Sequence, residues 1–287
     1  MRLGDFEVYR ALLQSELGVD IKPEKTYLLE SRLSPLYRKW GYPTIESMTL
    51  ALRAVPDPAL VHDVVQALTD NETWFFREPT KFQTLQNMVL PYLIKQRKRQ
   101  KKIHMWSAGC ASGQEAWSLA ISASNALEGM KNWTFDILAT DISNEAIEYA
   151  ERAIYNQQEA QSETGITQLI KYFEQSRIGW NVKDHLKDRV SFQISNLLHQ
   201  SEDFGVFDVI FCCNVIHEFT PEARAQVLDT LAYHLADDGF LFVGELDHWQ
   251  SRTPLFKAMP DQPHVLIRAE GDYKFADFPK AETKVRA

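Results

Sequence analysis

Cysteine is scarce in this chain of 287 residues, which has only Cys110, Cys212 and Cys213. An odd number, with two of the three adjacent, argues against a disulfide framework and for a reducing cytoplasm. None of them has the spacing of a zinc ligand set, so we expect no metal site. Long apolar runs are also missing, because no stretch approaches the ~18 apolar residues that span a bilayer. The N-terminal residues carry charges throughout, which predicts neither a signal peptide nor direct membrane insertion.

The charge of the chain is unevenly distributed. With 45% apolar and 24% charged residues and a net charge of −8, the composition is that of a soluble globular protein. Residues 1–102 hold 16 Lys and Arg against 12 Asp and Glu, whereas residues 103–287 hold 15 against 27. The mildly basic first third predicts an acidic partner for that part of the chain, and we expect no nucleic-acid partner. The basic run at 95–102 is equally well explained as a solvated helix end.

Residues 1–98 are predicted to form a small helical domain and a linker. Apolar side chains recur at helical spacing in the segments 6–17 and 29–40. Asp57 can cap a helix that follows it, and a further helix is expected to begin near Pro79.

Residues 99–287 are predicted to form an α/β domain with a doubly wound, mostly parallel sheet, because short apolar runs alternate with helices. The predicted strands are 103–107, 135–140, 190–194, 207–212 and 239–244. The predicted helices are 114–127, 144–155 and 221–235, the last two capped by Ser143 and Thr220. A terminal hairpin is expected from 264–268 and 273–276. Residues 156–189 fit the alternation poorly and are interpreted as an inserted subdomain, with one helix near 166–174 and an irregular polar stretch at 175–188.

Two features suggest a nucleotide-type ligand. The first predicted strand leads into Gly109-Cys110-Ala111-Ser112-Gly113, and small residues at such a turn let the backbone approach a ligand closely. Asp141 ends the next strand, where a carboxylate can accept both hydroxyls of a ribose. A tight turn and a helix cap would explain the same residues without a ligand. The two features suit NAD or S-adenosylmethionine (SAM) about equally, although the third glycine of the NAD fingerprint is missing.

Two longer strings resemble the CheR family of methyltransferases, which modify glutamates on chemotaxis receptors. They are NETWFFREP at 71–79 and IHMWSAGCASGQEAWS at 103–118, and the similarity covers roughly residues 5–245. The resemblance implies a helical N-terminal domain, a seven-stranded SAM-methyltransferase sheet, SAM as cofactor and S-adenosylhomocysteine (SAH) as product.

The resemblance also implies the cofactor contacts. The matching positions are Asn71, Thr73, Arg77, Glu115, Asp141, Asn196, Leu197, Cys213 and Asn214. Asp141 would hold the ribose, Asn196 and Leu197 would lie along the adenine, and Arg77 and Asn214 would be catalytic. Arg77 suits the carboxylate of SAM, because a guanidinium can bind it bidentately. A surface ion pair with Glu72 or Glu78 is the alternative for Arg77, and interdomain packing is expected for at least one of the aromatics at 74–76.

The implied substrate is an acidic helix of a chemoreceptor. In the family a basic helix of the N-terminal domain faces the substrate, and Arg32 and Arg38 match arginine positions of that helix. Ordinary solvated charges would explain them as well. A glutamate is already ionised near neutral pH, since its reference pKa is about 4.3, so no general base is required.

The chain departs from the family pattern in three places. Cys213 and Glu218 stand where the family usually has Arg and Tyr, and the added carboxylate could repel a glutamate. His217 could offset this if protonated, could act as a base toward a different acceptor, or could simply begin a loop. The string at 244–247 is Gly-Glu-Leu-Asp, where the family more often has Gly-His-Ser-Glu. The segment 175–188 is short, which counts against docking to the C-terminal pentapeptide of a receptor.

Four functional hypotheses follow from these observations, the last of them an NAD oxidoreductase. The leading one is a cytoplasmic protein-glutamate O-methyltransferase acting on chemoreceptor cytoplasmic helices or another acidic protein. The second keeps methyl transfer and changes the acceptor. The third is a non-catalytic signalling module that binds SAM or SAH. Binding of SAM, and the base lability of any transferred methyl group, would separate them.

Overall fold

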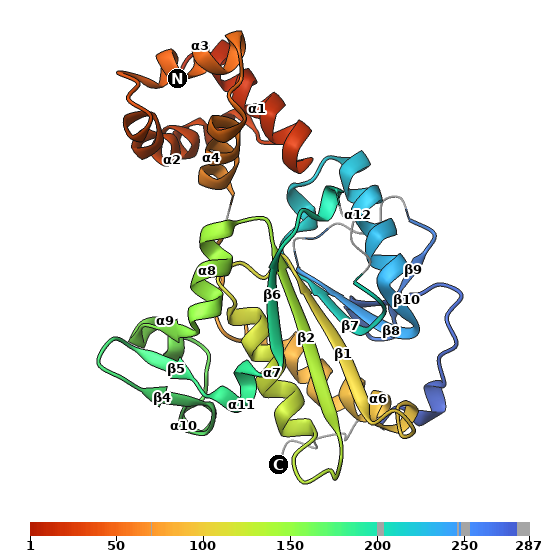
Figure 1. Ribbon diagram of the computed structural model, residues 1–287. Coiled ribbons are helices and arrows are strands. Elements are labelled where there is room, and N and C mark those ends of the chain that lie inside the picture. The colour runs from red at the N-terminus through yellow and green to blue at the C-terminus, as the bar shows by residue number, and fades with distance from the viewer. Residues whose placement is uncertain (70, 200–203, 246, 248–252, 280–287) are drawn as a thin grey trace, which may run out of the picture.

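The computed structural model describes residues 1–69, 71–199, 204–245, 247 and 253–279. The first four helices form a helical domain around an apolar core of their own: α1 (Leu3–Leu17), α2 (Thr26–Lys39), α3 (Ile45–Ala54) and α4 (Pro58–Leu68). Asp57 caps α4 by accepting the backbone N–H of Ala59 at 2.8 Å, as predicted. In Figure 1 this domain, in red and orange, lies above one end of the sheet.

A seven-stranded sheet forms the centre of the remaining chain, and the predicted fold class is confirmed. Its strands lie in the order β6-β2-β1-β7-β8-β10-β9, and the first five run parallel. At the other edge, β10 runs antiparallel to both of its neighbours, β8 and β9. The strand bounds are β1 Lys102–Ala108, β2 Thr134–Asp141, β6 Val190–Ile194, β7 Phe207–Cys212, β8 Leu235–Val243, β9 Phe256–Met259 and β10 Gln262–Arg268.

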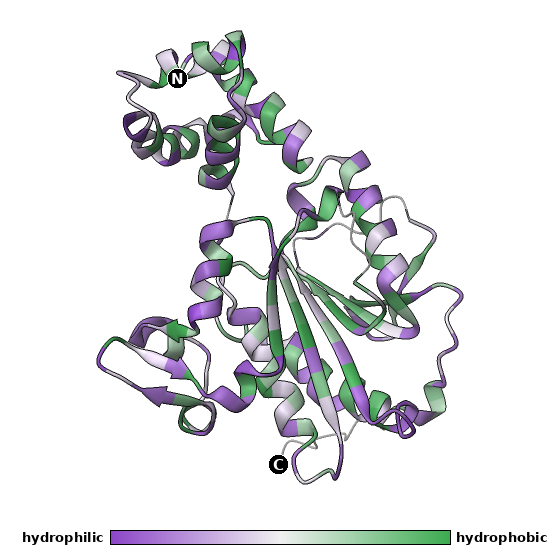
Figure 2. Ribbon diagram, in the orientation of Figure 1, coloured by the Kyte–Doolittle hydropathy of each residue, from purple (hydrophilic) through white to green (hydrophobic). Residues whose placement is uncertain are grey.

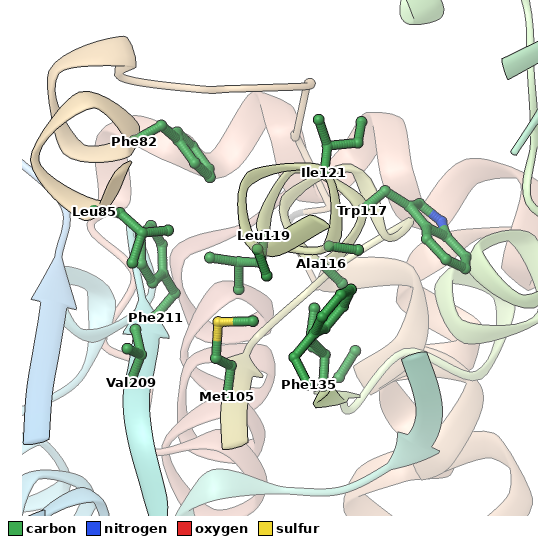
Figure 3. Packing of buried hydrophobic residues seen from close by; sticks show 14 of the residues in the cluster. Phe82, Leu85, Met105, Ala116, Trp117, Leu119, Ile121, Phe135, Val209 and Phe211 are labelled. Carbon is green, nitrogen blue, oxygen red and sulfur yellow. The ribbon is translucent and has the colours of Figure 1, made fainter. Parts of the chain in front are cut away.

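Helices cover both faces of this sheet. One face packs against α7 (Gln114–Ala126) and against a continuous helical segment made of α5 (Pro79–Thr84), η2 (Leu85–Val89) and α6 (Leu90–Gln96). Figure 3 shows side chains of α5, α7 and the strands β1, β2 and β7 meeting in this core. The other face packs against α12 (Pro221–His234). Figure 2 accordingly shows hydrophobic residues concentrated along the central strands.

The segment 75–96 belongs physically to the α/β core, although the sequence analysis assigned it to the helical domain and its linker. Phe75, Leu85, Val89 and Leu93 are fully buried in the cluster that covers β1 and β7. A segment whose apolar face is buried by the sheet shares the stability of the sheet. We therefore propose that the helical domain ends near Leu68 and not near residue 98.

The inserted subdomain is more regular than predicted. It contains a three-stranded antiparallel sheet in the order β3-β5-β4. Its elements are β3 Ile154–Tyr155, α9 Gln157–Gln161, α10 Ile166–Tyr172, β4 Phe173–Gln175, β5 Trp180–Val182 and α11 Asp184–Lys187. The expectation of an irregular stretch at 175–188 was wrong, because strands of two or three residues are too short to show alternation.

The end of one predicted helix also requires correction. The helix predicted over 144–155 is α8 (Asn144–Arg152), because Ala153 turns into the left-handed conformation with φ 53° and the chain continues as β3. Its cap is Ser143, and Thr220 caps α12, both as predicted.

The terminal hairpin lies earlier than predicted, between β9 and β10, with Asp261 at its turn at φ 60°. Aspartate tolerates this conformation, so no glycine was needed there. Gly271, where the turn was expected, instead lets the chain pass Asp237, since a Cβ there would lie 2.3 Å from the Asp237 carbonyl oxygen. Within the described residues, no helix is both long enough and apolar enough to cross a membrane.

Candidate functional site

A cavity of about 390 Å³ lies between the helical domain and the carboxyl ends of the parallel strands. Its lower wall comes from the segments that follow β1, β2, β6 and β7, and its upper wall comes from α1, α2 and the residues that follow α4. Ligands of open α/β sheets bind at this edge, because the loops and helix N-termini converge there. Of the predicted site residues, Arg32, Thr73, Arg77, Glu115, Asp141, Asn196, Leu197, Cys213 and Asn214 line it.

The turn after β1 is shaped by two glycines in the left-handed region. Gly109 has φ 81°, and a Cβ at this position would lie 2.6 Å from Cγ2 of Val215. Gly113 has φ 92°, and a Cβ there would lie 2.7 Å from Cβ of Ala150. Both positions need glycine for conformation and for space. The turn is therefore held close to the loop after β7 on one side and to α8 on the other.

Asp141 is fixed at the end of β2 by backbone donors. Its Oδ2 accepts the N–H of Ala111 at 2.8 Å, and its Oδ1 accepts the N–H of Ser143 at 2.9 Å. Burial raises the pKa of this carboxyl, and the backbone N–H groups oppose that rise. A carboxylate has about four acceptor positions, so acceptor capacity remains for a ligand hydroxyl. The geometry fits the ribose role that the sequence predicted.

Glu115 lies on the cavity wall in the first turn of α7. Its Oε1 accepts the hydroxyl of Ser107 at 2.7 Å. Burial raises the pKa of Glu115 to about 7, although the Ser107 hydroxyl and the charges of Lys81 and Arg77 act in the opposite direction. Because this pKa lies near neutral pH, a cationic ligand group beside Glu115 would shift the carboxyl to its ionised form. The ammonium of SAM is such a group.

The 71–77 string is divided between the cavity and the protein core. Thr73 and Arg77 face the cavity, and the Arg77 guanidinium lies 4.3 Å from the Trp74 ring centroid and donates to the Glu72 carbonyl at 2.6 Å. Phe75 is fully buried with its ring against Tyr155 and Phe173, so one of the aromatics has a packing role, although this packing lies within the α/β core and not between the domains.

Asn71 is absent from the described lining of the cavity. Its side-chain amide donates to Ser143 Oγ at 3.1 Å, and its Oδ1 is buried without a hydrogen-bond partner among the described residues. Asn71 therefore contacts the residue that caps α8, two positions after Asp141. The expected direct contact with the cofactor stays a prediction.

The loop after β6 is tied to the helical domain. The amide of Asn196 donates to the carbonyl of Glu16 at 2.8 Å, and its Oδ1 accepts the N–H of Leu198 at 2.9 Å. Leu197 is buried on the cavity wall and offers an apolar surface. This edge of the cavity could therefore hold a planar base against an apolar side chain.

The loop after β7 is anchored by Asp247. One carboxylate oxygen accepts the N–H groups of Asn214 at 2.8 Å and Gly244 at 2.6 Å. The other accepts the N–H of His217 at 2.9 Å and lies 3.2 Å from its Nδ1. Asn214 itself has φ 60°, and its Nδ2 is buried without a partner in the part of the chain that the structure describes. A buried donor on the wall of a cavity fits a ligand acceptor.

Sequence reasoning recorded the strings at 213–219 and 244–247 as separate departures from the family and missed their contact. Cys213, between Cys212 and Asn214, lines the cavity, and burial raises the pKa of its thiol well above the usual range. A neutral thiol at this position cannot replace the cation that the family usually carries there. Two further residues with an electrostatic effect on the site, Lys25 and Lys81, were also missed, since only the fold brings them near it.

The helical domain closes over the loop after β7. Lys25 Nζ lies 3.1 Å from Glu218 Oε1, so a cation lies beside the carboxylate that was expected to repel a glutamate. Backbone hydrogen bonds join the same segments, from Asp20 to the carbonyl of Glu218 at 3.1 Å and from Thr220 to the carbonyl of Gly18 at 2.7 Å. The upper wall is therefore hydrogen-bonded to the loop that carries Asn214 and His217.

The two arginines predicted to bind substrate lie in different environments. Arg32 lines the cavity, and its guanidinium donates to the carbonyls of Leu68 and Thr69, both at 3.1 Å. Arg38 is exposed, with its guanidinium 5.7 Å from the Tyr37 ring centroid. Arg32 therefore supports the end of α4 above the cavity, whereas Arg38 is presented to the outside.

Comparison with known families divides the chain into the same two parts as the structure. The model described as "CheR methyltransferase, SAM binding domain" matches residues 71–265, and the model described as "CheR methyltransferase, all-alpha domain" matches residues 4–69. The junction between the two matches falls at the end of α4 and not at residue 98.

Similar full-length proteins are found in several bacteria. Chemotaxis protein methyltransferase Cher2 of Pseudomonas putida is 29% identical over 93% of this chain and 98% of its own length. Chemotaxis protein methyltransferase 1 of Pseudomonas aeruginosa is 30% identical over the same shares. Chemotaxis protein methyltransferase of Borreliella burgdorferi is 29% identical over 87% of this chain and 89% of its own length.

Proposed function

Since the chain belongs to the CheR methyltransferase family, we propose that it forms methyl esters on glutamate side chains of chemoreceptors or receptor-like proteins. The observation that carries the proposal is the cavity shared by the helical domain and the sheet, with Asp141, Glu115 and Arg77 on its wall. The relatives named for chemotaxis methylation align with both parts, so the element that would meet a receptor is included in the likeness.

We assign the cofactor contacts by charge and burial. Asp141 binds the ribose hydroxyls through its remaining acceptor positions, and Glu115 binds the ammonium. Arg77 faces the cavity with donors beyond the one used on Glu72, and these suit a carboxylate. Leu197 and Asn196 lie along the adenine, and Asn214 lies at the methyl end. Asn71 holds the cap of α8 behind Asp141.

Bound SAM supplies a methyl group on a cationic sulfur. The chain must then hold an ionised glutamate oxygen in line with that methyl group and keep water away. No side chain needs to remove a proton, because the acceptor carboxylate is already ionised. The position of the cavity beneath α1, α2 and the end of α4 serves this purpose.

The acidic partner would approach over the helical domain. Arg38 on α2 is exposed there, and Arg32 lies on the cavity wall beneath it. We expect the reaction to occur in the cytoplasm, which the three unpaired cysteines support.

Two measurements test the proposal in order. Calorimetry should first detect SAM and SAH binding, and absence of both would contradict the cofactor assignment. Tritiated SAM should then label receptor cytoplasmic fragments, and mild base should release the label as methanol, as expected for a methyl ester. Fragments whose accepting glutamates are replaced by alanine are the matched control and should stay unlabelled.

A second acceptor class is favoured by two observations, the neutral Cys213 and the contact between His217 and Asp247 on the cavity wall. An imidazole oriented by a carboxylate can serve as a general base toward a neutral nucleophile. Label that resists base would support this alternative and would exclude a glutamate ester.

A further inference from the structure

The loop at residues 141–144, which we call the ribose loop, is held by the helical domain as well as by its own backbone. The side chain of Gln66, in the last turn of α4, reaches two main-chain groups of this loop. Its Nε2 donates to the carbonyl of Ile142 at 2.8 Å, and its Oε1 accepts the N–H of Asn144 at 2.8 Å. One amide of the helical domain therefore binds the ribose loop in two places, next to Asp141.

Further contacts join the same two segments. The Ile142 side chain packs against the apolar core of the helical domain and also lines the cavity. Asn71, which follows α4, donates to Ser143 Oγ at 3.1 Å. The N–H of Asn144 lies in the first turn of α8, where a helix offers no main-chain acceptor, so Gln66 supplies the partner from another domain. The helical domain is thus part of the support of the ribose loop.

One peptide group connects Gln66 to Asp141. The carbonyl that accepts from Gln66 belongs to the peptide between Ile142 and Ser143, and the N–H of the same peptide donates to Asp141 Oδ1 at 2.9 Å. A peptide group is planar, so an anchor on its carbonyl also fixes the direction of its N–H. The hydrogen bond to the carbonyl also polarises the peptide, which strengthens its N–H as a donor. Both effects act on the Asp141 carboxylate.

The other main-chain donor to Asp141 lies on a different segment. It is the N–H of Ala111, in the glycine turn after β1, which donates to Oδ2 at 2.8 Å. The N–H of Gly109 donates to the carbonyl of Thr140 at 2.8 Å and holds that turn against the end of β2. The two oxygens of one carboxylate are therefore held by different means, one through the sheet and one through the helical domain.

We propose that Gln66 is a positioning residue for the cofactor, which orients the Asp141 carboxylate toward the ribose through the peptide between Ile142 and Ser143. The ribose site is then complete only when the helical domain is in place above the cavity. The role of Gln66 rests on the assignment of Asp141 to the ribose under the proposed function. It does not depend on the identity of the methyl acceptor.

The test replaces Gln66 with methionine in the full-length protein, because methionine has a similar length and no amide. The dissociation constants of SAM and SAH from calorimetry should rise by about fivefold to thirtyfold, as expected for the loss of two neutral hydrogen bonds. Gln14→Met is the matched control, because the Gln14 side chain is exposed and its amide donates to Asp20 within the helical domain. The control should bind SAM within about twofold of the parent protein.

Hydrogen exchange in the cofactor-free protein separates positioning from a general loss of stability. In Gln66→Met, the amide hydrogen of Ser143 should exchange about tenfold faster, because its peptide has lost the anchor. The amide hydrogen of Ala111, which donates to the same carboxylate from the glycine turn, should stay within about twofold. A merely structural role of Gln66 would accelerate both amides together.

Each failure has a different meaning. Unchanged SAM affinity in Gln66→Met, or equal acceleration of both amides, would overturn the role of Gln66. If Asp141→Ala also binds SAM as tightly as the parent protein, the ribose assignment itself fails. Absence of SAM and SAH binding by the unaltered protein would contradict the cofactor assignment. Absence of a base-labile product on receptor fragments would contradict the proposed acceptor and would leave the role of Gln66 standing.

Discussion

Two parts of the lower wall of the cavity, called the first wall and the second wall, are held in different ways. The wall at the ends of β1 and β2 is fixed by local backbone features, namely the glycine turn and the two N–H groups bound to Asp141. The wall after β7 is fixed by side chains from distant segments, with Asp247 from beyond β8 and Lys25 from the helical domain. The first wall therefore suits a cofactor, which is the same in every reaction. The second wall can differ with the methyl acceptor.

The largest effect is expected from breaking the first wall with Asp141→Ala. The change removes the acceptors for the Ala111 and Ser143 N–H groups and for the predicted ribose contacts. Each hydrogen bond to a charged group contributes roughly 1.5–3 kcal/mol, so SAM affinity should fall by about a hundredfold or more. Calorimetry measures this directly, and unchanged affinity would refute the ribose assignment.

A smaller and different effect is expected from breaking the second wall with Asp247→Ala. Three backbone N–H groups and the His217 ring would lose their acceptor. We expect the stability to fall by about 2 kcal/mol and methyl transfer to fall by about thirtyfold. SAM affinity should change by less than about fivefold, since the loop is released while the first wall stays intact. Denaturant unfolding, calorimetry and labelling together check this separation, which a hundredfold loss of SAM affinity would contradict.

The variant Glu115→Gln tests the first wall through the pH dependence of the protein's stability. The pKa of Glu115 is raised to about 7 from 4.5, so the folded protein binds an extra proton between these values and loses stability as pH rises through this window. Glutamine removes that loss. The variant should therefore be more stable than the parent at pH 8 by about 2 kcal/mol and similar to it near pH 4. Thermal unfolding at both pH values measures the difference.

The same variant should bind SAM about tenfold more weakly at pH 8, because the ammonium loses a charged partner. The matched change Glu151→Gln, on the exposed side of α8, should alter neither quantity. Greater stability together with weaker binding would identify Glu115 as a residue kept for the ligand, whereas lower stability of Glu115→Gln at pH 8 would contradict this.

The smallest effect is expected for the ion pair between Lys25 and Glu218, whose side chains are 51% and 29% exposed. Exposed pairs contribute about 0–1 kcal/mol, and salt screens them. The two single variants Lys25→Met and Glu218→Gln, together with the double variant, should give a coupling energy below about 1 kcal/mol that decreases in high salt. A coupling of several kcal/mol would show that the closure of the helical domain depends on this pair and not on the backbone contacts beside it.

The sequence alone was sufficient for most of the first wall. Gly109, Gly113, Glu115 and Asp141 lie within two strand-turn-helix units, so neighbours in the chain are neighbours in the site. The five parallel strands were predicted for a similar reason, since an apolar run of five to eight residues has a clear pattern. The small sheet β3-β5-β4 was missed because its strands are too short to show one.

What only the tertiary structure decided is how distant segments meet across the cavity. Asp247 lies 30 positions from His217, and Lys25 lies 193 positions from Glu218, yet each pair is in contact. Nothing in the local pattern of either partner indicates the other, because a buried carboxylate or an ion pair takes its partner from whichever segment the packing brings near. The sequence therefore determined the family, the sheet and the first wall, which is the one assigned to the cofactor. The second wall depends on the way the loop after β7 contacts the residues beyond β8 and the helical domain.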